Sequence, residues 1–375
     1  MKVVIATTTG FHWRNLYGEF CKCDIDVQYF SYMPRFRLRR DGIPDAKSKS
    51  LFFRLLPDSA LALFRYAPKI RSGAEARMWE ATDDIMARCV PPCDVFIGLS
   101  AMAVKCAEVA RARHGAKIVI ERGSRHVLSQ NELVSQDGGK PLSAYYIERE
   151  LASYDVADYI SLPSKHAVRS FLDRGFDRSR LFENPLAVDL AAYQPTPRPE
   201  APTRILFLGG WSHRKGVDIL VKAMKRLPGF FLTHVGVRVD VAFPDAAWFT
   251  SLGYVNQRVL ADVIADHHLL VLPSREDGFG MVLLEALACG LPIVASRTTG
   301  GPDIQDIITA KEYVGIVEPG SVDDLVRGLS EMAARAALVP VARNLLTPAD
   351  RCRLGASGYA ARYFDFLTRI VASTR

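Results

Sequence analysis

The stretch LPSREDGFGMVLLEALACGLPIVA, residues 272–295, decides how the rest of the chain is interpreted. Its pattern predicts the end of a buried strand, a loop with two glycines, a helix of about three turns and a second strand. Two carboxylates lie within it: Asp277 in the loop, and Glu285 on the helix face that also carries Met281 and Ala288. A loop that leads into a helix presents backbone N–H groups to an anion. The stretch therefore predicts a site for a phosphorylated, hydroxyl-rich ligand.

Length and composition bound the class of protein. The chain has 375 residues, 49% of them hydrophobic, which is enough for two cores. Its formal net charge of +7 favours anionic ligands, but no nucleic-acid-binding motif accompanies it, so nucleic acid is not an expected partner. The seven cysteines are odd in number and scattered, which is typical of the cytoplasm. Cys21 and Cys23, with Cys89 and Cys93, lack the spacing and the histidines of a zinc site.

The first half of the chain alternates between strand-like and helical patterns. Strands are predicted at residues 2–7, 25–32, 95–100, 117–122 and 159–163, and helices at 101–113, 143–157 and 165–174. Such alternation predicts a sheet with helices on both faces. Residues 2–7 are expected to be a first strand rather than part of a signal peptide. No run of about 18 apolar residues predicts a membrane-spanning helix.

Residues 30–71 interrupt this alternation. They carry four arginines, at positions 35, 37, 39 and 40, followed by the apolar and aromatic segment LFFRLLPDSALALFRYAPKIR. Such a segment is typical of contact with an anionic membrane surface, and more often of surface helices packed on their own domain. Both interpretations stay open. The first would make the protein peripheral at the inner face of the membrane.

A second alternation follows a proline-rich break. Residues 191–203 are predicted to be a linker, because proline recurs there and apolar periodicity stops. Beyond it, strands are predicted at 204–208, 230–235, 269–272, 292–296 and 313–317, helices at 217–227, 259–265 and 321–335, and a turn at 300–302. The segment 351–374 is predicted to be helical and to cross back to the first half. The expected domains are residues 1–190 with 351–375, and residues 204–350.

The loop GGWSHRKG, residues 209–216, lies between a predicted strand and a predicted helix. Gly209 and Gly210 let the backbone come close to a ligand. Arg214 and Lys215 can neutralise a diphosphate as it leaves. An Arg-Lys pair in a loop is usually only solvated, but open α/β sheets bind ligands at the carboxyl ends of their strands. The position of the loop therefore favours a function.

The two carboxylates of residues 272–295 also have a plain interpretation. An Asp before a Gly is a common turn residue, and Glu285 on a polar helix face needs no function. Against this, carboxylates suit sugar recognition because they accept strong hydrogen bonds from paired hydroxyls. Asp277 and Glu285 are therefore candidate ligand-binding residues.

Several motifs carry a family resemblance. GGWSHRKG, LPSREDGFGMVLLEALACGLPIVAS and TTGGPDI resemble the nucleotide-sugar-binding domain of glycosyltransferase family 4, or glycosyltransferase group 1, whose members are retaining enzymes of the GT-B fold. The likeness continues through LGYVNQRVLADVIADHHLLVLPS and, more faintly, ERGSRH, ERELASYDVADYISLPS and NPLAVDL. It implies an α/β fold of two Rossmann-like, doubly wound domains that face a central cleft. The donor would lie mainly on the second domain and the acceptor mainly on the first.

The resemblance also implies roles for single residues. Arg214 and Lys215 match the pair that holds the donor diphosphate, and Glu285 matches the acid that binds the ribose hydroxyls. Asp277 stands where the family usually has the first glutamate of its E-x7-E motif, which is a departure from the pattern. Glu276 is next to it but out of frame by one residue. The donor-sugar role therefore goes to Asp277, with a shorter side chain.

Other positions match the family's donor site less directly. They belong to the loop on the donor sugar and phosphate, to the base pocket and to the glycine turn that faces the phosphates: Gly280, Met281, Val282, Val255 and Gly10. His126 fits the histidine that approaches the donor sugar. A histidine that follows Ser-Arg is as often an ordinary loop residue, so both interpretations stay open.

The implied reaction moves a sugar from a nucleotide diphosphate sugar to an acceptor hydroxyl with retention, by front-face attack. Neither cofactor nor metal is expected, because Arg214 and Lys215 can stabilise the leaving group and the one Asp-x-Asp, residues 24–26, is far from the donor motifs. The acceptor would be a saccharide, a glycolipid or a small molecule, in polysaccharide or glycolipid assembly. Two alternatives are a catalytically weak nucleotide-sugar-binding partner subunit, which the departure at Asp277 favours, and a Rossmann-type dehydrogenase. The absence of G-x-G-x-x-G disfavours the dehydrogenase.

Overall fold

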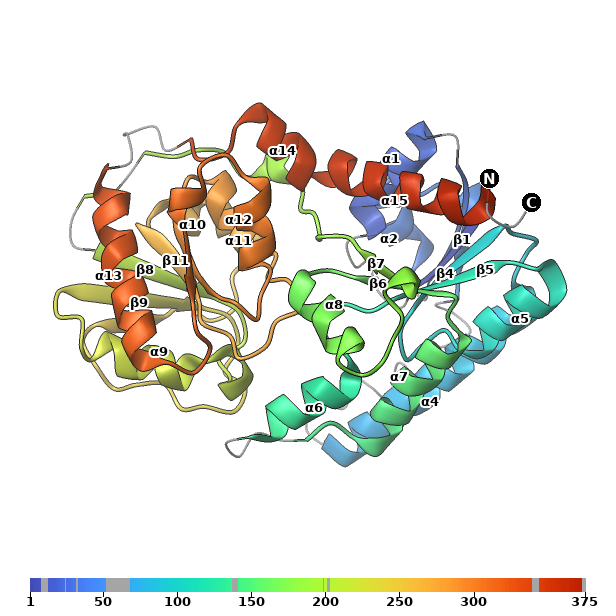
Figure 1. Cartoon of the computed structure of the whole chain (residues 1–375), viewed down its shortest axis with the longest axis horizontal. Coiled ribbons are helices and arrows are strands. Elements are labelled where there is room, and N and C mark those ends of the chain that lie inside the picture. The colour runs from blue at the N-terminus through green and yellow to red at the C-terminus, as the bar shows by residue number, and fades with distance from the viewer. Residues whose placement is uncertain are drawn as a thin grey trace.

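The computed structural model describes residues 1–7, 13–23, 25–31, 33–51, 68–136, 141–197, 199–200, 203–338 and 344–372, with backbone only for 13–16, 68–78 and 257–258. They form two lobes that lie side by side (Figure 1). The chain runs through the first lobe, crosses to the second, and returns to the first at its C-terminal helix.

The first lobe is built on a seven-stranded parallel sheet of order β3-β2-β1-β4-β5-β6-β7. In that order the strands are Ser48–Ser50, Asp26–Ser31, Lys2–Thr7, Val95–Leu99, Lys117–Glu121, Tyr159–Leu162 and Leu181–Glu183. The helices are α1 (Trp13–Lys22), α2 (Arg35–Arg40), α4 (Pro68–Cys89), α5 (Lys105–His114), α6 (Val127–Ser135), α7 (Ala144–Val156) and α8 (Lys165–Leu172). The strand order reverses between β1 and β4, which makes a topological switch point there.

The second lobe repeats this design with six parallel strands in the order β10-β9-β8-β11-β12-β13. In that order they are Phe249–Ser251, Phe230–Val235, Thr203–Leu208, Leu269–Leu272, Ile293–Ser296 and Val314–Val317. The helices are α9 (Val217–Met224), α10 (Gln257–Ala265), α11 (Val282–Ala288), α12 (Gly301–Ile307) and α13 (Val322–Leu338). The switch point lies between β8 and β11. Two doubly wound domains with a cleft between them are the GT-B fold, so the predicted fold is confirmed.

The central strands of each sheet contain continuous apolar runs. All four residues of β11 and all four of β12 are buried, because helices cover both faces of the sheet (Figure 1). A strand buried on both faces cannot show the apolar-polar alternation of a surface strand. The prediction of the inner strands from apolar runs therefore agrees with the structure, to within one or two residues at their ends.

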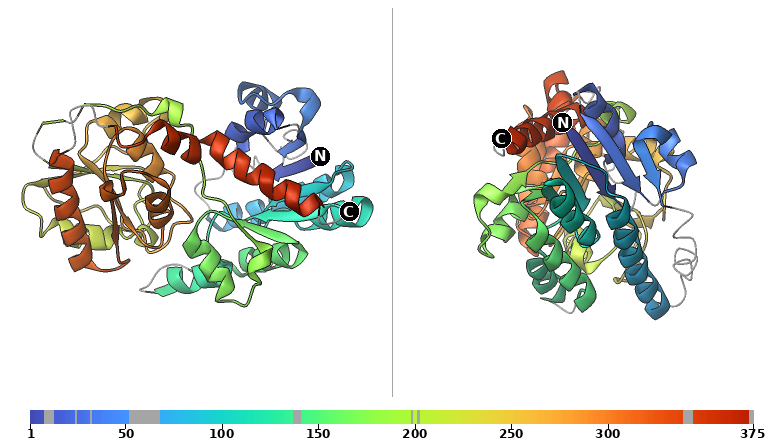
Figure 2. Two further views of the ribbon diagram at one scale, coloured as in Figure 1. Left: turned by 45° about the horizontal axis from the view of Figure 1, so that its top comes forward. Right: turned by 90° about the vertical axis from the view of Figure 1, so that its right-hand side faces the viewer.

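The chain ends in two helices, α14 (Pro348–Leu354) and α15 (Ala356–Ala372). Helix α15 lies along the first lobe (Figure 2), where the Phe366 ring stacks on that of Phe182 with 4.0 Å between the centroids. Tyr363 Oη donates a hydrogen bond to Glu121 Oε1 (2.5 Å), so the helix is also joined to the end of β5. The predicted return of the chain to the first lobe is confirmed.

Several predicted segments differ in the structure: the helix expected at 101–113 begins at Lys105, and the segment 351–374 is divided between α14 and α15. Residues 300–302, expected as a turn, begin α12, because Pro302 occupies its first turn. Helix α11 has seven residues, two turns rather than three. The expected linker is packed in part: Thr196 N donates to Cys289 O (3.3 Å), and Arg351 Nη1 donates to Tyr193 O (3.1 Å).

The basic segment 30–71 is only partly described. It contains the end of β2, the six-residue helix α2 and the short strand β3, and residues 52–67 lie outside the described part. Helix α2 buries Leu38 and exposes its four arginines, and the Phe36 side chain is 69% exposed. In the described part of the chain, no helix is long and apolar enough to cross a membrane.

Candidate active site

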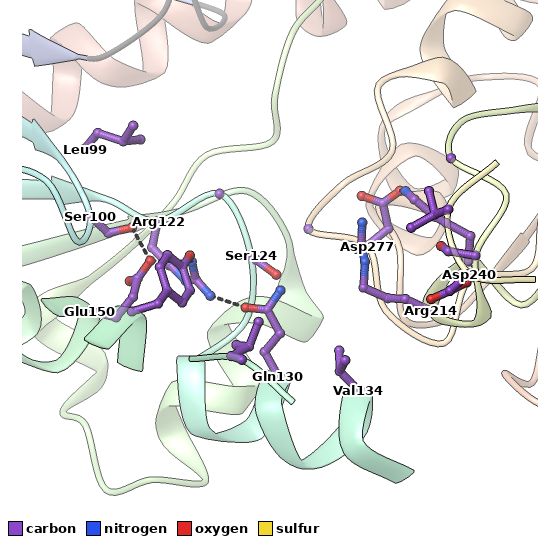
Figure 3. Close-up of a pocket in the computed structure, with 18 of the residues that line it drawn as sticks. Leu99, Ser100, Arg122, Ser124, Gln130, Val134, Glu150, Arg214, Asp240 and Asp277 are labelled. Carbon is purple, nitrogen blue, oxygen red and sulfur yellow. Dashed lines mark hydrogen bonds and ion pairs between the residues drawn. The ribbon is translucent and has the colours of Figure 1, made fainter. Parts of the chain in front are cut away.

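A cavity of 690 Å³ lies between the lobes, where both topological switch points open. Its walls come from the loops after β4 and β5 and helices α4, α6 and α7 of the first lobe, and from the loops after β8, β9 and β11 of the second (Figure 3). The lining residues are Trp79, Leu99, Ser100, Arg122, Gly123, Ser124, Gln130, Val134, Leu142, Tyr146, Glu150, Gly210, Ser212, Arg214, Lys215, Val239, Asp240, Asp277 and Gly278. Open α/β sheets bind ligands at such positions.

Two loops of the second lobe meet in this wall. The residues after β8 form a short 3-10 turn, His213–Lys215, which ends at Gly216 in a left-handed conformation (φ 71°). A Cβ at Gly216 would lie 2.1 Å from Pro273 O, so only glycine allows this approach to the loop after β11. Arg275 N then donates to Arg214 O (2.9 Å), which joins the two loops. The two sequence motifs of the second lobe therefore meet at the switch point.

Each cation of the site has a carboxylate partner. Lys215 Nζ forms an ion pair with Asp277 Oδ2, and both side chains are largely buried, 14% and 17% exposed. Arg214 Nη1 donates to Glu276 Oε2 (3.0 Å) and to Glu276 O (2.9 Å). Burial alone would raise the pKa of the Asp277 carboxyl, but the Lys215 ammonium and the Arg214 guanidinium outweigh it and hold this pKa below its ordinary value. Asp277 is therefore an anion that faces the cavity.

The loop of Asp277 also touches the first lobe. A Cβ at Gly278 would lie 1.8 Å from Gly123 O, so the two backbones are in direct contact. Ser164 Oγ, at the start of α8, donates to Gly278 O (2.7 Å), and His166 Nε2 lies 2.8 Å from Asp277 O. Burial lowers the pKa of His166, so its neutral ring donates this bond. The first lobe thus holds the loop that presents the Asp277 carboxylate.

Arg122 organises the first-lobe wall. It follows β5, is only 4% exposed, and pairs with the fully buried Glu150 (2.7 Å). Its guanidinium also donates to Tyr146 Oη (2.9 Å) and to Gln130 Oε1 (2.5 Å). Figure 3 shows Gln130 and Ser124 on the same side of the cavity, facing the loops of the second lobe. One buried cation therefore sets the direction of several polar groups on this wall.

Aromatic rings lie beside these polar groups. The Trp79 and Tyr146 rings have centroids 5.9 Å apart, and both line the cavity with Leu142 and Val134. An apolar surface next to hydrogen-bonding groups is typical of a site for a small organic ligand.

Four of the predicted residues line the cavity together: Gly210, Arg214, Lys215 and Asp277. Gly209 precedes them at φ 140°, and its carbonyl oxygen lies 2.9 Å from His234 Nε2. The structure also distinguishes the two adjacent carboxylates that the motif leaves ambiguous, because Asp277 lines the cavity whereas the Glu276 side chain is fully buried.

The predicted residues in and just before α11 are not among those that line this cavity. Glu285 was expected on a polar helix face, but it is only 9% exposed, because the turn at Leu190–Ala192 and the following Tyr193 cover that face. Burial raises the pKa of Glu285, and a hydrogen bond with Tyr193 opposes this shift. Gly280, with φ 80°, leads into Met281 and Val282 at the start of the helix.

Three further predictions have other outcomes. His126 does not line the cavity: its ring is 3% exposed and packs against Tyr154, Phe171 and Phe176. Burial and nearby arginines lower its pKa to about 4, so it is neutral. A role for His126 at the donor sugar does not agree with this position. Val255 is half-buried on the hydrophobic core, away from the cavity lining, and Gly10 lies outside the described residues.

Sequence reasoning missed most of the first-lobe groups. Arg122 and Ser124 lie within the quoted motif ERGSRH, and Glu150 lies within ERELASYDVADYISLPS, but only the histidine of these motifs was singled out. The position of Arg122 at the carboxyl end of a predicted strand was the available signal. In the described residues, no group of three or more His, Cys, Asp and Glu side chains could hold a metal ion.

Comparison with known proteins agrees with this geometry. Residues 202–335, nearly the whole second lobe, match the family model of the glycosyl transferases group 1. This match identifies the second lobe as a glycosyltransferase group 1 domain. The group 1 lobe thus contains Arg214, Lys215 and Asp277. A D-inositol 3-phosphate glycosyltransferase 1 from Catenulispora acidiphila is 30% identical over 262 residues, 60% of this chain and 61% of the relative.

Solved structures show the same fold over the whole chain. Sucrose-phosphate synthase from Thermosynechococcus elongatus aligns over 100% of both chains with a TM-score of 0.70 and 18% identity. Anabaena Alr3699/HepE, solved with UDP-glucose, aligns over 98% of this chain and 100% of its own with a TM-score of 0.63 and 14% identity. This chain spans less than two thirds of the length of the curated relatives that it matches.

Proposed function

We propose that this protein transfers a glycosyl group from a nucleotide diphosphate sugar to an acceptor hydroxyl, with retention at the anomeric carbon. One observation carries the proposal: Arg214 and Lys215 face a cavity at the switch point of a group 1 lobe, next to an anionic Asp277. Residues of both lobes line the cavity, so a donor on one lobe and an acceptor on the other can meet in it. Proteins of similar fold were solved with UDP or UDP-glucose, which makes UDP-glucose the first donor to test.

The cations suit the chemistry of the leaving group. As the bond between the anomeric carbon and the phosphate oxygen breaks, its electron pair passes to the diphosphate, where Arg214 and Lys215 stabilise the added charge. The acceptor oxygen bonds to the anomeric carbon on the same face, and its proton passes to the departing phosphate oxygen. A diphosphate that takes the place of Asp277 on Lys215 would release this carboxylate to accept hydrogen bonds from the donor sugar. We expect activity to persist in EDTA, since two side-chain cations serve the diphosphate.

The first-lobe wall fits a saccharide acceptor. The Trp79 and Tyr146 rings offer an apolar surface to the C–H face of a sugar ring, and Gln130 and Ser124 offer hydrogen bonds to its hydroxyls. On this basis we expect Trp79→Ala to raise the KM for the acceptor and to leave the affinity for the donor nucleotide unchanged.

Titration with UDP tests the donor site directly. We expect UDP to bind the wild type, and Lys215→Ala to lower kcat/KM by about 10²–10³-fold, because the variant lacks a cation on the leaving group. Lys222→Ala, which removes an exposed lysine on α9, is the matched control. Near-wild-type turnover of Lys215→Ala would refute the diphosphate role. An inverted product by NMR would refute retention, and UDP-sugar binding without transfer or hydrolysis would favour the partner-subunit alternative.

We also propose that α2 attaches the protein to an anionic membrane surface, which would place a glycolipid acceptor within reach. Its support is the exposed Phe36 among four exposed arginines on a helix that buries only Leu38. We expect binding to phosphatidylglycerol vesicles that falls with salt, and that is weakened by replacing Arg35 and Arg37 with glutamine. Equal binding to neutral and anionic vesicles would contradict this attachment.

A further inference from the structure

Glu276 bridges the two lobes beneath the cavity. Its side chain, on the loop after β11, is fully buried. One carboxylate oxygen accepts from the Ser124 hydroxyl of the first lobe. The other accepts from Gln130 Nε2 of the first lobe (3.4 Å) and from Arg214 Nη1 of the second (3.0 Å). A single carboxylate therefore joins the diphosphate-facing arginine to the opposite lobe.

The first-lobe donors are themselves held in place. Gln130 Oε1 accepts from Arg122 Nη2 (2.5 Å), and Arg122 pairs with the buried Glu150 (2.7 Å). The hydrogen bonds thus form a continuous path from Glu150 through Arg122, Gln130 and Glu276 to Arg214. Opening the cleft would break this path at Glu276, because Ser124 and Gln130 would move away with their lobe. A carboxylate in such a site is costly without its donors, so the complete set favours the closed arrangement.

Arg214 keeps part of its guanidinium free in this arrangement. It holds Glu276 through Nη1 alone, and within the described residues its Nε and Nη2 donate to no protein group. A guanidinium that is fixed at one corner presents its remaining N–H groups in one direction, which suits a phosphate oxygen. Asp277, the neighbouring carboxylate, pairs instead with Lys215 and faces the cavity. The two adjacent acids therefore have separate roles.

We propose that Glu276 is a positioning residue that couples closure of the two lobes to the orientation of Arg214 at the donor diphosphate. The identity of the ligand in this inference rests on the proposed function. The coupling itself rests only on the contacts between the lobes. Coupling between two sites acts in both directions. Binding of a nucleoside diphosphate to Arg214 therefore favours closure, and closure favours binding in the geometry that transfer requires.

Glu276→Gln tests the proposal, since it keeps the size of the side chain and removes the charge. By small-angle X-ray scattering, wild type with UDP should be compact and the variant should have a larger radius of gyration, with and without UDP. We expect kcat to fall by about tenfold or more, while the Kd for UDP changes by less than about threefold, because loss of an anion beside Arg214 offsets loss of its anchor. Ser124→Ala, which leaves the Arg214–Glu276 pair intact, should shift closure and kcat in the same direction.

Asp306→Asn is the matched control, because it removes another interlobe ion pair, with Lys165, in which both side chains are exposed (58% and 53%). We expect wild-type closure and kcat from it. Thermal unfolding checks that Glu276→Gln is folded. If Glu276→Gln is not folded, the closure and kcat of Ser124→Ala alone test the coupling. Wild-type closure and kcat in both variants would overturn the coupling. Absence of nucleotide binding by the wild type would instead overturn the proposed function, and the scattering comparison without UDP would still test the interlobe bridge.

Discussion

Asp277 departs from the E-x7-E motif that the second lobe otherwise resembles, and its contacts show where the departure acts. The side chain is short, largely buried, and paired with Lys215 at the edge of the cavity. A glutamate at this position would carry its carboxylate one methylene further into the cavity. Under the proposed function this acid lies at the donor sugar, so we expect the shorter side chain to affect recognition of the sugar more than binding of the diphosphate.

Substitutions of Asp277 separate these two effects. We expect Asp277→Asn to bind UDP at least as tightly as the wild type, since one anion beside the diphosphate is gone, while transfer falls by about 10²-fold. Asp277→Glu keeps the charge and should change the preference among UDP-sugars. Calorimetry with UDP and turnover with a panel of UDP-sugars measure both effects, with exposed Asp262→Asn as control. Weaker UDP binding by Asp277→Asn would contradict this assignment.

At the scale of elements, the start of α8 and the start of α12 form a contact between the lobes. Lys165 N donates to Asp303 Oδ1 (2.9 Å), and the second oxygen of this buried carboxyl has no hydrogen-bond partner among the described residues. Burial raises the pKa of Asp303 from 3.8 to about 7. The folded protein therefore holds a proton on Asp303 at a pH where the unfolded chain has released it.

This proton makes the contribution of Asp303 depend on pH. Unfolding releases it between pH 3.8 and about 7, so the free energy of unfolding falls as the pH rises through this window. Asp303→Asn has no proton to release at this position, so its free energy of unfolding does not fall in this pH window. Its side-chain oxygen still accepts the hydrogen bond from Lys165 N. We expect the variant to equal the wild type near pH 4 and to be more stable by about 2–4 kcal/mol at pH 8. Urea unfolding at both pH values measures the difference, and Asp306→Asn, on the exposed side of the same helix, should show no such gain.

At the scale of the whole molecule, the two lobes are joined by two crossings of the chain that lie against each other. Arg362 Nε donates to Asn184 Oδ1 (2.7 Å), and Arg351 Nη1 donates to Leu190 O (3.1 Å), so the returning helices hold the outgoing segment. Helix α15 then packs on α1 and on Phe182 of β7. The first lobe therefore depends for its core on residues from the far end of the chain.

Truncating one ring of α15 tests this dependence. Phe366 is 5% exposed and stacks on Phe182, so Phe366→Ala should destabilise the first lobe by about 3–5 kcal/mol through the cavity that it leaves. Binding of UDP should survive, because the group 1 lobe is untouched. Thermal unfolding with and without UDP measures both, and Phe36→Ala, at an exposed site, should stay within about 0.5 kcal/mol of wild type. Equal effects of the two substitutions would contradict the role of α15.

Local sequence was sufficient for the inner strands of both sheets and for the second-lobe part of the site. The apolar patterns of β1, β9 and β11 predicted these strands to the residue. The reason is plainest for β11, which is buried throughout and is therefore apolar throughout. Arg214, Lys215 and Asp277 could be found because the carboxyl ends of parallel strands gather at one edge of a sheet, so loops that follow strands share a site. Both arguments use only neighbours along the chain and the regular geometry of the elements.

Tertiary packing decided the rest. Glu285 is buried by Tyr193, and His126 by the rings of Tyr154 and Phe171, and no local pattern marks such covering segments. The bridge at Glu276 joins residues 152 positions apart in the chain, in different lobes. Contacts of this kind depend on how the two lobes pack against each other. The sequence around either residue has no periodic pattern that indicates this packing.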